Sequence, residues 1–191
     1  MYKILRVNLK DHQIKWEEVP EYLELFWGRG LTAAVLLKEV QPTCEPLGKH
    51  NKLIFSAGPL AGSPVPCSAR LSVGGKSPLT GGIKEANAGG NLGHKLGKLK
   101  LKGIVIEDKA GDGQLWVLCI KGGEASLVKA PELKGLSTFQ TVSELKKRFG
   151  GRIAAAVIGP AGEMGLAASG IAVTDVDGRP SRYAARGAWV L

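Results

Sequence analysis

Two stretches of the chain carry residue types that bind anionic or planar ligands through main-chain groups. The first is ANAGGNLG at residues 86–93, and the second is GRPSRYAARG at residues 178–187. Glycine lets the backbone approach a ligand closely and exposes N–H groups that can point at phosphate oxygens or ring atoms. The first stretch therefore predicts a loop that cradles a phosphate or a cofactor, and a plain turn-rich linker is the alternative interpretation.

Arginines accompany both stretches: Arg70 precedes the first, and Arg179, Arg182 and Arg186 lie in the second. The planar guanidinium presents a fork of donors that suits phosphate oxygens and the carbonyls and ring nitrogens of a pterin. Solvated surface arginines are the alternative. The spacing excludes two familiar phosphate loops, because the Lys-Ser pair at 76–77 precedes the glycines and no long apolar strand leads into them.

The sequence lacks the residue sets of common enzyme mechanisms. The three histidines and three cysteines are scattered and form no CxxC pair, so the sequence has no internal zinc or iron–sulfur motif. No serine occupies a nucleophile elbow. Four carboxylates could act in acid–base chemistry, but we interpret them as solvated and assign no catalytic residue. They are Glu85, Glu163, Asp175 and Asp177.

The net charge of +9, from 26 basic and 17 acidic residues, suits an anionic partner. The densest basic segment is KLGKLKLKG at residues 95–103, which we interpret as a solvated strand edge that discourages edge pairing. Nucleic-acid binding is not expected, because no aromatic stacking platform or known module accompanies these lysines. No apolar run reaches the length of a membrane span, so no membrane partner is expected. The odd number of cysteines and the lack of a signal peptide predict a cytoplasmic location.

Short strands and many turns must position these residues, because 27 glycines and 10 prolines leave few helix-favouring stretches. Alternating apolar and polar residues predict a hairpin over residues 2–19, and an interrupted helix follows from about Pro20 to Val40. Apolar segments predict strands beginning near Lys52 and Ala69. Residues 76–97 contain too many glycines for a stable helix and too few large apolar side chains for a core strand.

The second half repeats this order, with a hairpin that turns at a Gly-Gly pair, a helix capped by Ser137 or Thr138, and an apolar strand ending in Gly-Pro. IFSAGPLAG aligns with AAVIGPAGE at an offset of 101 residues. We therefore predict an α+β fold in one domain, residues 1–191, internally duplicated into two similar, mostly antiparallel β-sheets, each with a helix. The pseudo-repeats span about 1–100 and 101–191, so the two ligand-binding stretches would flank one shared cleft.

The sequence also resembles a known family through motifs that occur in the same order. These motifs are GRGL, NKLIFSAGPLAG, KSPLTGG, ANAGGNLGHKL, GIVIEDKA, AVIGPAGE and R-x-A-x-R-G. They are similar to the N-terminal domain of tungsten-dependent aldehyde:ferredoxin oxidoreductases, and the resemblance spans Tyr2 to about Ala188. It implies a base of two similar β-sheet halves that carries a tungsten (or molybdenum) bis-pyranopterin cofactor, with magnesium bridging the pterin phosphates.

Matched motif by motif, the resemblance also implies which residues contact the cofactor. The asparagine of AN-x-GG is Asn87, whose backbone carbonyl would face the magnesium ion, and Tyr183 in the tail motif would do the same through its backbone. Arg70 would lie between a pterin and a [4Fe–4S] cluster. The implied cofactor-binding residues are Arg70, Asn87, Ala88, Gly89, Gly90, Arg182, Tyr183 and Ala184.

The chain departs from the family in two respects. Its tail reads RYAARGA at residues 182–188, so Tyr183 and Ala185 add bulk where the family has small residues beside the cofactor. The sequence stops at Leu191, whereas family members continue into two helical domains that hold the cluster cysteines and the acid–base residues.

The resemblance implies the tungstopterin-binding domain or subunit of an aldehyde:ferredoxin oxidoreductase. Such an enzyme oxidises an aldehyde to a carboxylic acid and passes electrons through a 4Fe–4S cluster to ferredoxin. Expected partners are the pterin cofactor and a subunit that carries the helical, cluster-binding domains, with self-association as a further option. Activity from this chain alone is not expected. The alternative is a non-catalytic pterin-binding module or a truncated relic.

Overall fold

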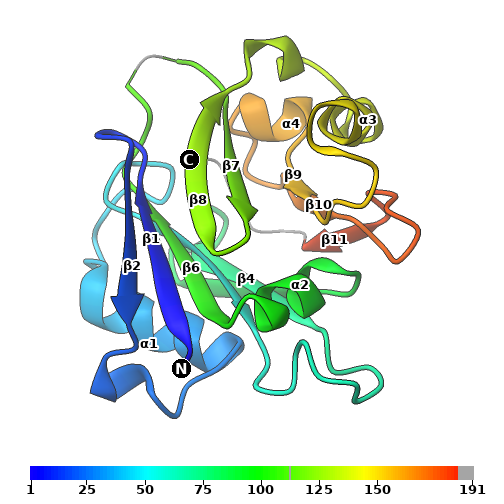
Figure 1. The fold of residues 1–191 in the computed structure, drawn as a ribbon. Helices are drawn as coiled ribbons and strands as arrows, with labels where there is room; N and C mark the ends of the chain where they lie inside the picture. The colour runs from blue at the N-terminus through cyan, green and yellow to red at the C-terminus, as the bar shows by residue number, and fades with distance from the viewer. Residues whose placement is uncertain (112, 185–191) are drawn as a thin grey trace.

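The computed structural model describes residues 1–111 and 113–184 and consists of short strands with a few helices (Figure 1). The first half contributes β1 (Lys3–Asn8), β2 (Gln13–Glu18), η1 (Glu21–Leu23), α1 (Arg29–Glu39), β3 (Lys52–Ala57), β4 (Leu71–Lys76), β5 (Ile83–Ala88), α2 (Leu92–Lys98) and β6 (Leu101–Glu107). The second half contributes β7 (Trp116–Lys121), β8 (Glu124–Lys129), η2 (Pro131–Leu133), α3 (Thr138–Phe149), β9 (Ala156–Val157), α4 (Pro160–Glu163), β10 (Ile171–Val173) and β11 (Arg182–Ala184).

The largest sheet has six strands in the order β2-β1-β6-β3-β4-β5. Its neighbouring strands are antiparallel except for the parallel pair β1 and β6. The other sheets are β11-β10-β9 and the hairpin β7-β8, both antiparallel. The prediction of an α+β fold with mostly antiparallel sheets is therefore confirmed.

The prediction of two similar sheets is wrong, because the described strands form sheets of six, three and two strands. Strand β6, which the repeat assigned to the second half, lies between β1 and β3 of the first half. Its apolar sequence is buried there, which is typical of a strand covered on both faces. The order hairpin, 3-10 turn, helix and three antiparallel strands does occur twice. Internal duplication itself stays a prediction.

The two faces of the six-stranded sheet are covered by different elements (Figure 1). On one face, Ile4, Ile54 and Val105 form a buried cluster with residues of α1. On the other face, their neighbours along the strands pack against β7, β8, β10 and β11 of the second half. Successive side chains of a strand point to opposite faces, so one apolar run serves both clusters. A third cluster lies beneath α3 and includes Val142, Leu145 and Val157.

Both long helices begin at positions set by local chemistry. Helix α1 begins at Arg29, later than predicted, after Gly28 adopts a φ of +51° that favours glycine. The Gly28 N–H donates to Ser56 Oγ at 3.0 Å, which ties the start of the helix to β3. Helix α3 begins after Ser137, which forms a capping box with Gln140, so the predicted N-cap is confirmed.

The expectation that residues 76–97 are too glycine-rich for a stable helix is wrong, whereas the expectation that they contain no core strand agrees with β5, which is an edge strand. Strand β5 forms the edge of the large sheet, and α2 covers residues 92–98. Glycine lowers helix propensity, but here it permits close packing: a Cβ on Gly93 would lie 2.4 Å from the Ala69 carbonyl oxygen, and one on Gly97 would lie 1.9 Å from that of Ala61. Tertiary packing therefore stabilises a helix that propensity alone disfavours.

The sequence suggested that the lysine-rich segment at residues 95–103 is a solvated strand edge, and the structure shows that it is not. Its strand is β6 at the centre of the sheet, and Lys102 is only 2% exposed. The Lys102 ammonium donates to the Glu24 carbonyl oxygen at 2.6 Å and lies 4.1 Å from the Trp27 ring centroid. Burial lowers the pKa of Lys102. This lysine therefore fastens the segment before α1 to the sheet.

Candidate functional site

The residues of the first predicted stretch lie at one end of the large sheet, where β4 begins and β5 ends. Leu71 pairs with Ala88, and Arg70 and Gly89 are the next residues along each strand. A Cβ on Gly89 would lie 3.5 Å from Arg70 Nη1, so the guanidinium borders the bare glycine backbone. Arg70 and Asn87 are exposed, whereas Ala88 is buried.

The second stretch reaches the same place. Strand β11, residues Arg182–Ala184, pairs with β10 and packs against β5. Ala184 is fully buried in the cluster that also contains Ala88, while Arg182 is exposed and Tyr183 is 50% exposed. The structure therefore brings together both stretches that the sequence singled out. Arg186 and Ala185 lie outside the described residues.

Hydrogen bonds join the first stretch to Thr174, the residue that follows β10 in the second half. The Asn91 N–H donates to the Thr174 carbonyl oxygen at 3.0 Å, and the Thr174 hydroxyl donates to Asn91 Oδ1 at 2.7 Å. Gly90 has a φ of +111°, and a Cβ there would lie 2.3 Å from the Thr174 carbonyl oxygen. Gly90 is therefore required by contact with the second half, in addition to any contact with a ligand.

The turn before β11 is organised by Asp175. Its Oδ1 accepts hydrogen bonds from the N–H groups of Asp177 at 2.9 Å and Arg179 at 2.8 Å, and its Oδ2 accepts from the Ser181 hydroxyl at 2.7 Å. The Ser181 and Arg179 hydrogen bonds stabilise the carboxylate and lower the pKa of Asp175. The predicted solvated carboxylate is thus the centre of a structured turn.

Two arginines of this region are free to bind an anion. Among residues 1–111 and 113–184, the guanidinium groups of Arg70 and Arg182 have no hydrogen-bond or ion-pair partner. By contrast, Arg29 forms an ion pair with Glu85, Nε to Oε2 at 3.1 Å. The guanidinium of Arg70 beside the Gly89 backbone, and that of Arg182 on the strand packed against β5, have the donor chemistry of a phosphate site.

Glu85 contacts the Asn87 side chain, and the sequence did not predict this contact. Its side chain is only 9% exposed, and its Oε1 accepts from the Ser72 hydroxyl at 2.7 Å and from the Asn87 side-chain amide. Alternation along β5 places Glu85 and Asn87 on the same face, and this is the signal that could have revealed the contact. Glu163 is also bound, because its carboxylate accepts from the Gly135 N–H at 2.9 Å.

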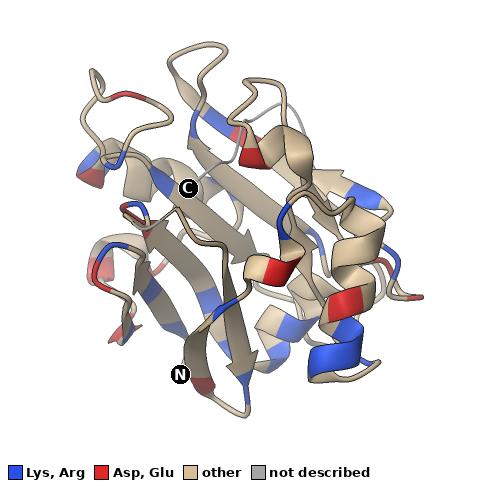
Figure 2. Ribbon diagram, turned by 90° about the horizontal axis from the view of Figure 1, so that it is seen from above, with Lys and Arg blue, Asp and Glu red and all other residues tan. Residues whose placement is uncertain are grey.

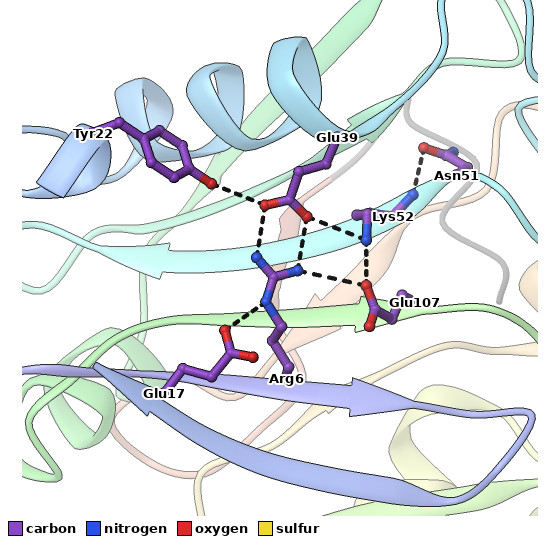
Figure 3. Close-up of polar contacts among 7 residues, drawn as sticks. All are labelled: Arg6, Glu17, Tyr22, Glu39, Asn51, Lys52 and Glu107. Carbon is purple, nitrogen blue, oxygen red and sulfur yellow. Dashed lines mark hydrogen bonds and ion pairs between the residues drawn. The ribbon is translucent and has the colours of Figure 1, made fainter. Parts of the chain in front are cut away.

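A second polar cluster lies at the opposite end of the sheet and was not predicted (Figure 3). Arg6 on β1 makes a bidentate contact with Glu39 at the end of α1, at 2.8 and 2.6 Å. Lys52 Nζ lies 3.3 Å from Glu39 Oε2 and also contacts Glu107. The Tyr22 hydroxyl donates to Glu39 Oε1 at 3.0 Å. These five residues come from five separate elements, so only the fold brings them together.

The charge state of Glu39 follows from this cluster. Burial alone would raise the pKa of Glu39, but hydrogen bonds and charge from Arg6, together with Tyr22 and Lys52, lower it to about 2. The hydrogen bond to Glu39 correspondingly raises the pKa of Arg6. An open polar depression of about 520 Å³ borders the cluster and includes Lys49 and His50. Because its carboxylates are already paired with cations, we interpret this region as structural.

The remaining charges are spread over both halves (Figure 2). No group of three or more histidine, cysteine or acidic side chains in the described part of the chain is arranged to hold a metal ion. Over the same residues, every helix is too short or too polar to cross a membrane. The cysteines Cys44, Cys67 and Cys119 are all free thiols. A metal held here would therefore need backbone carbonyls or an additional ligand.

Comparison with known proteins gives a consistent result. The family model described as "Aldehyde ferredoxin oxidoreductase, N-terminal domain" matches residues 4–189. The tungsten-containing aldehyde ferredoxin oxidoreductase of Pyrococcus furiosus is 40% identical over 164 residues, and that of Thermococcus kodakarensis is 39% identical over 164 residues. Each match covers 84% of this chain and 27% of the relative, so the chain spans about a quarter of the length of these enzymes.

A solved structure shares the fold. The chain superposes with a TM-score of 0.89 and 29% identity on the "Active site complex BamBC of Benzoyl Coenzyme A reductase in complex with 1,5 Dienoyl-CoA". The match covers 97% of this chain and 28% of that chain. The similarity thus extends over nearly all of the present sequence.

Proposed function

The chain belongs to the aldehyde ferredoxin oxidoreductase N-terminal domain family, and we propose on this premise that it is the tungstopterin-binding domain of an aldehyde:ferredoxin oxidoreductase. The observation that carries the proposal is that Arg70 borders the backbone of Gly89 at the end of β5, while β11, the strand that carries Arg182, packs against β5. Two unpartnered guanidiniums and bare glycine backbone provide donors for the phosphates of a pyranopterin.

The residues present fit a phosphorylated, magnesium-bridged group. The backbone at Asn87 lies on the edge strand of the large sheet, and the backbone at Tyr183 lies on a strand packed against it. We propose that carbonyls at these two positions face the magnesium ion. The Tyr183 side chain is half exposed, so its bulk does not prevent a role for its main chain.

In the proposed enzyme the cofactor supplies the two-electron oxidation of an aldehyde to a carboxylic acid. The part of this chain is to bind and orient the cofactor: Arg70 and Arg182 neutralise phosphate charge, and the glycines allow the main chain to come close. Glu85 holds the side chain of Asn87, and the buried Ala88 and Ala184 fix both stretches to one core. We propose that the cluster-binding and acid–base functions, and the contact with ferredoxin, come from polypeptide outside the present sequence.

The proposal is tested by calorimetric titration of the purified chain with magnesium-loaded molybdopterin and with its tungsten form. We expect micromolar or tighter binding that is lost when magnesium is chelated. A matched titration uses the Arg152→Gln variant, because Arg152 is another exposed arginine without a partner in the described structure but lies beyond the end of α3. Equal loss of binding in Arg152→Gln and Arg70→Gln would show that only general charge is involved.

Recovery of the chain from native cells provides a second test. We expect it to copurify with a helical, cysteine-containing polypeptide that holds an iron–sulfur cluster. Recovery without such a partner, together with tight pterin binding, would favour the alternative of a non-catalytic cofactor carrier.

A further inference from the structure

Two adjacent residues of the second half, Thr174 and Asp175, each organise one of the stretches described above. We propose that they are positioning residues that hold the Asn87–Gly90 segment and the Arg182–Ala184 segment in a fixed register. The proposal rests on the proposed function in so far as the register serves cofactor binding. Neither residue is assigned a contact with the cofactor, so their role is indirect.

Thr174 is fully buried and is anchored within its own half by Ala155. Its N–H donates to the Ala155 carbonyl oxygen at 3.0 Å, and its hydroxyl oxygen accepts from the Ala155 N–H at 2.9 Å. The same hydroxyl donates its proton to Asn91 Oδ1 at 2.7 Å. The hydroxyl of Thr174 therefore accepts a hydrogen bond within its own half and donates one to the other half. Neither Ala nor Val could make these two bonds.

Main-chain contact closes the same junction. The Thr174 carbonyl oxygen accepts from the Asn91 N–H at 3.0 Å, and the absence of a side chain at Gly90 permits this approach. Asn91 directly follows the Asn87–Gly90 segment and directly precedes α2. Fixing Asn91 therefore fixes where the first segment ends.

Asp175 performs the corresponding task for the second segment. Its carboxylate accepts from Asp177, Arg179 and Ser181, and its N–H donates to the Arg179 carbonyl oxygen at 2.8 Å. Six residues lie between Asp175 and Arg182, and this turn directs the chain from β10 back along β11. Because Thr174 and Asp175 are adjacent in the chain, fixing these two residues also fixes the position of one segment relative to the other.

The experiment uses Thr174→Val, which keeps the shape of the side chain and removes the hydroxyl. Thr174→Ser restores the hydroxyl. Thr32→Val is the matched control, because Thr32 is also fully buried but its hydroxyl has no hydrogen-bond partner among residues 1–111 and 113–184. The readouts are amide hydrogen exchange at Ala155, Asn91 and Arg179, and affinity for magnesium-loaded molybdopterin.

In Thr174→Val we expect exchange of the Ala155 and Asn91 amides to be about tenfold faster, while that of Arg179 is unchanged, and pterin affinity to fall about tenfold. Thr174→Ser should restore both properties, and Thr32→Val should change neither. Asp175→Ala should show the complementary pattern, with faster exchange at Arg179 and an unchanged Asn91 amide.

Unchanged exchange at Asn91 in Thr174→Val would overturn the proposal. Faster exchange with unchanged pterin affinity would also overturn it, because the hydroxyl would then be structural only, and the proposed function would stand. A wild-type chain that does not bind the pterin at millimolar concentration overturns the proposed function instead. The exchange comparison then still decides whether Thr174 fixes the register of the two segments.

Discussion

Substitution of Glu39 by Gln gives a prediction whose magnitude follows from the structure. The Glu39 side chain is 19% exposed and accepts from Arg6 and Tyr22. Its folded-state pKa of about 2 compares with an ordinary value of 4.5. A difference of about 2.5 pH units corresponds to about 3 kcal/mol of stability when the group is ionised in both states. We therefore expect Glu39→Gln to lower the free energy of unfolding by about 3 kcal/mol at pH 7.

The stabilisation that Glu39 provides should decrease as the pH falls. The pKa of Glu39 is depressed in the folded state, so its contribution is fully present above pH 4.5 and is lost as the pH falls toward 2. By pH 3 the wild-type protein should have lost about 2 kcal/mol from this group. The difference between wild type and Glu39→Gln should therefore narrow to about 1 kcal/mol at pH 3.

Urea unfolding followed by tryptophan fluorescence measures both quantities. Glu144→Gln is the matched control, because Glu144 pairs with Lys147 on the surface and its side chain is 41% exposed. That variant should lie within about 0.5 kcal/mol of wild type at pH 7. A Glu39→Gln penalty that stays constant from pH 7 to pH 3 would refute the reasoning, because the penalty would then be unrelated to ionisation.

The other predictions concern the glycines and the arginines of the site. Gly93→Ala should destabilise the protein by about 2 kcal/mol in urea unfolding, because the added Cβ would lie 2.4 Å from the Ala69 carbonyl oxygen. Gly151→Ala is the control, because a Cβ at Gly151 would meet open space. Its free energy of unfolding should stay within about 0.5 kcal/mol of wild type. Arg70→Ala and Arg182→Ala should each weaken binding of magnesium-loaded molybdopterin about tenfold or more, since each removes a charge-assisted contact, while thermal melting stays within about 2 °C of wild type. A large fall in melting temperature would indicate that the arginines are structural instead.

Local patterns predicted much of the fold. The hairpin β7-β8 turns at Gly122 and Gly123 as expected, and both glycines have positive φ. The cap of α3 at Ser137 was also predictable, because capping depends on residues close in sequence. The order of elements further led to the expectation that the two stretches flank one shared cleft. The packing of β11 against β5 brings the two stretches together, and the cleft stays a prediction.

The features that were missed depend on contacts between distant residues. Helix α2 forms because Gly93 and Gly97 pack against the backbone of an earlier loop, which propensity does not register. The position of β6 is determined by pairing with β1 and β3, so its lysines could not be assigned to an edge or a centre from sequence alone. The hydrogen bond from Thr174 to Asn91 spans 83 residues of sequence.

The glycines illustrate the limit of sequence reasoning about the site. The glycines of residues 86–93 suggested a ligand-binding loop, yet Gly90 and Gly93 are each required by close approach of protein backbone. Only Gly89, beside Arg70, has a neighbour that can move aside for a ligand. The glycines in the sequence indicated backbone without side chains, and the packing determines which of these glycines can still contact a ligand.

The central claim is that the β5 and β11 segments together bind a phosphorylated pterin. It is tested most directly by backbone amide NMR of the purified chain during titration with magnesium-loaded molybdopterin. The account predicts saturable shifts confined to Asn87–Gly90, Arg182–Ala184 and their immediate neighbours, with the two groups titrating together. Saturable shifts at another surface, or in only one of the two segments, would contradict it.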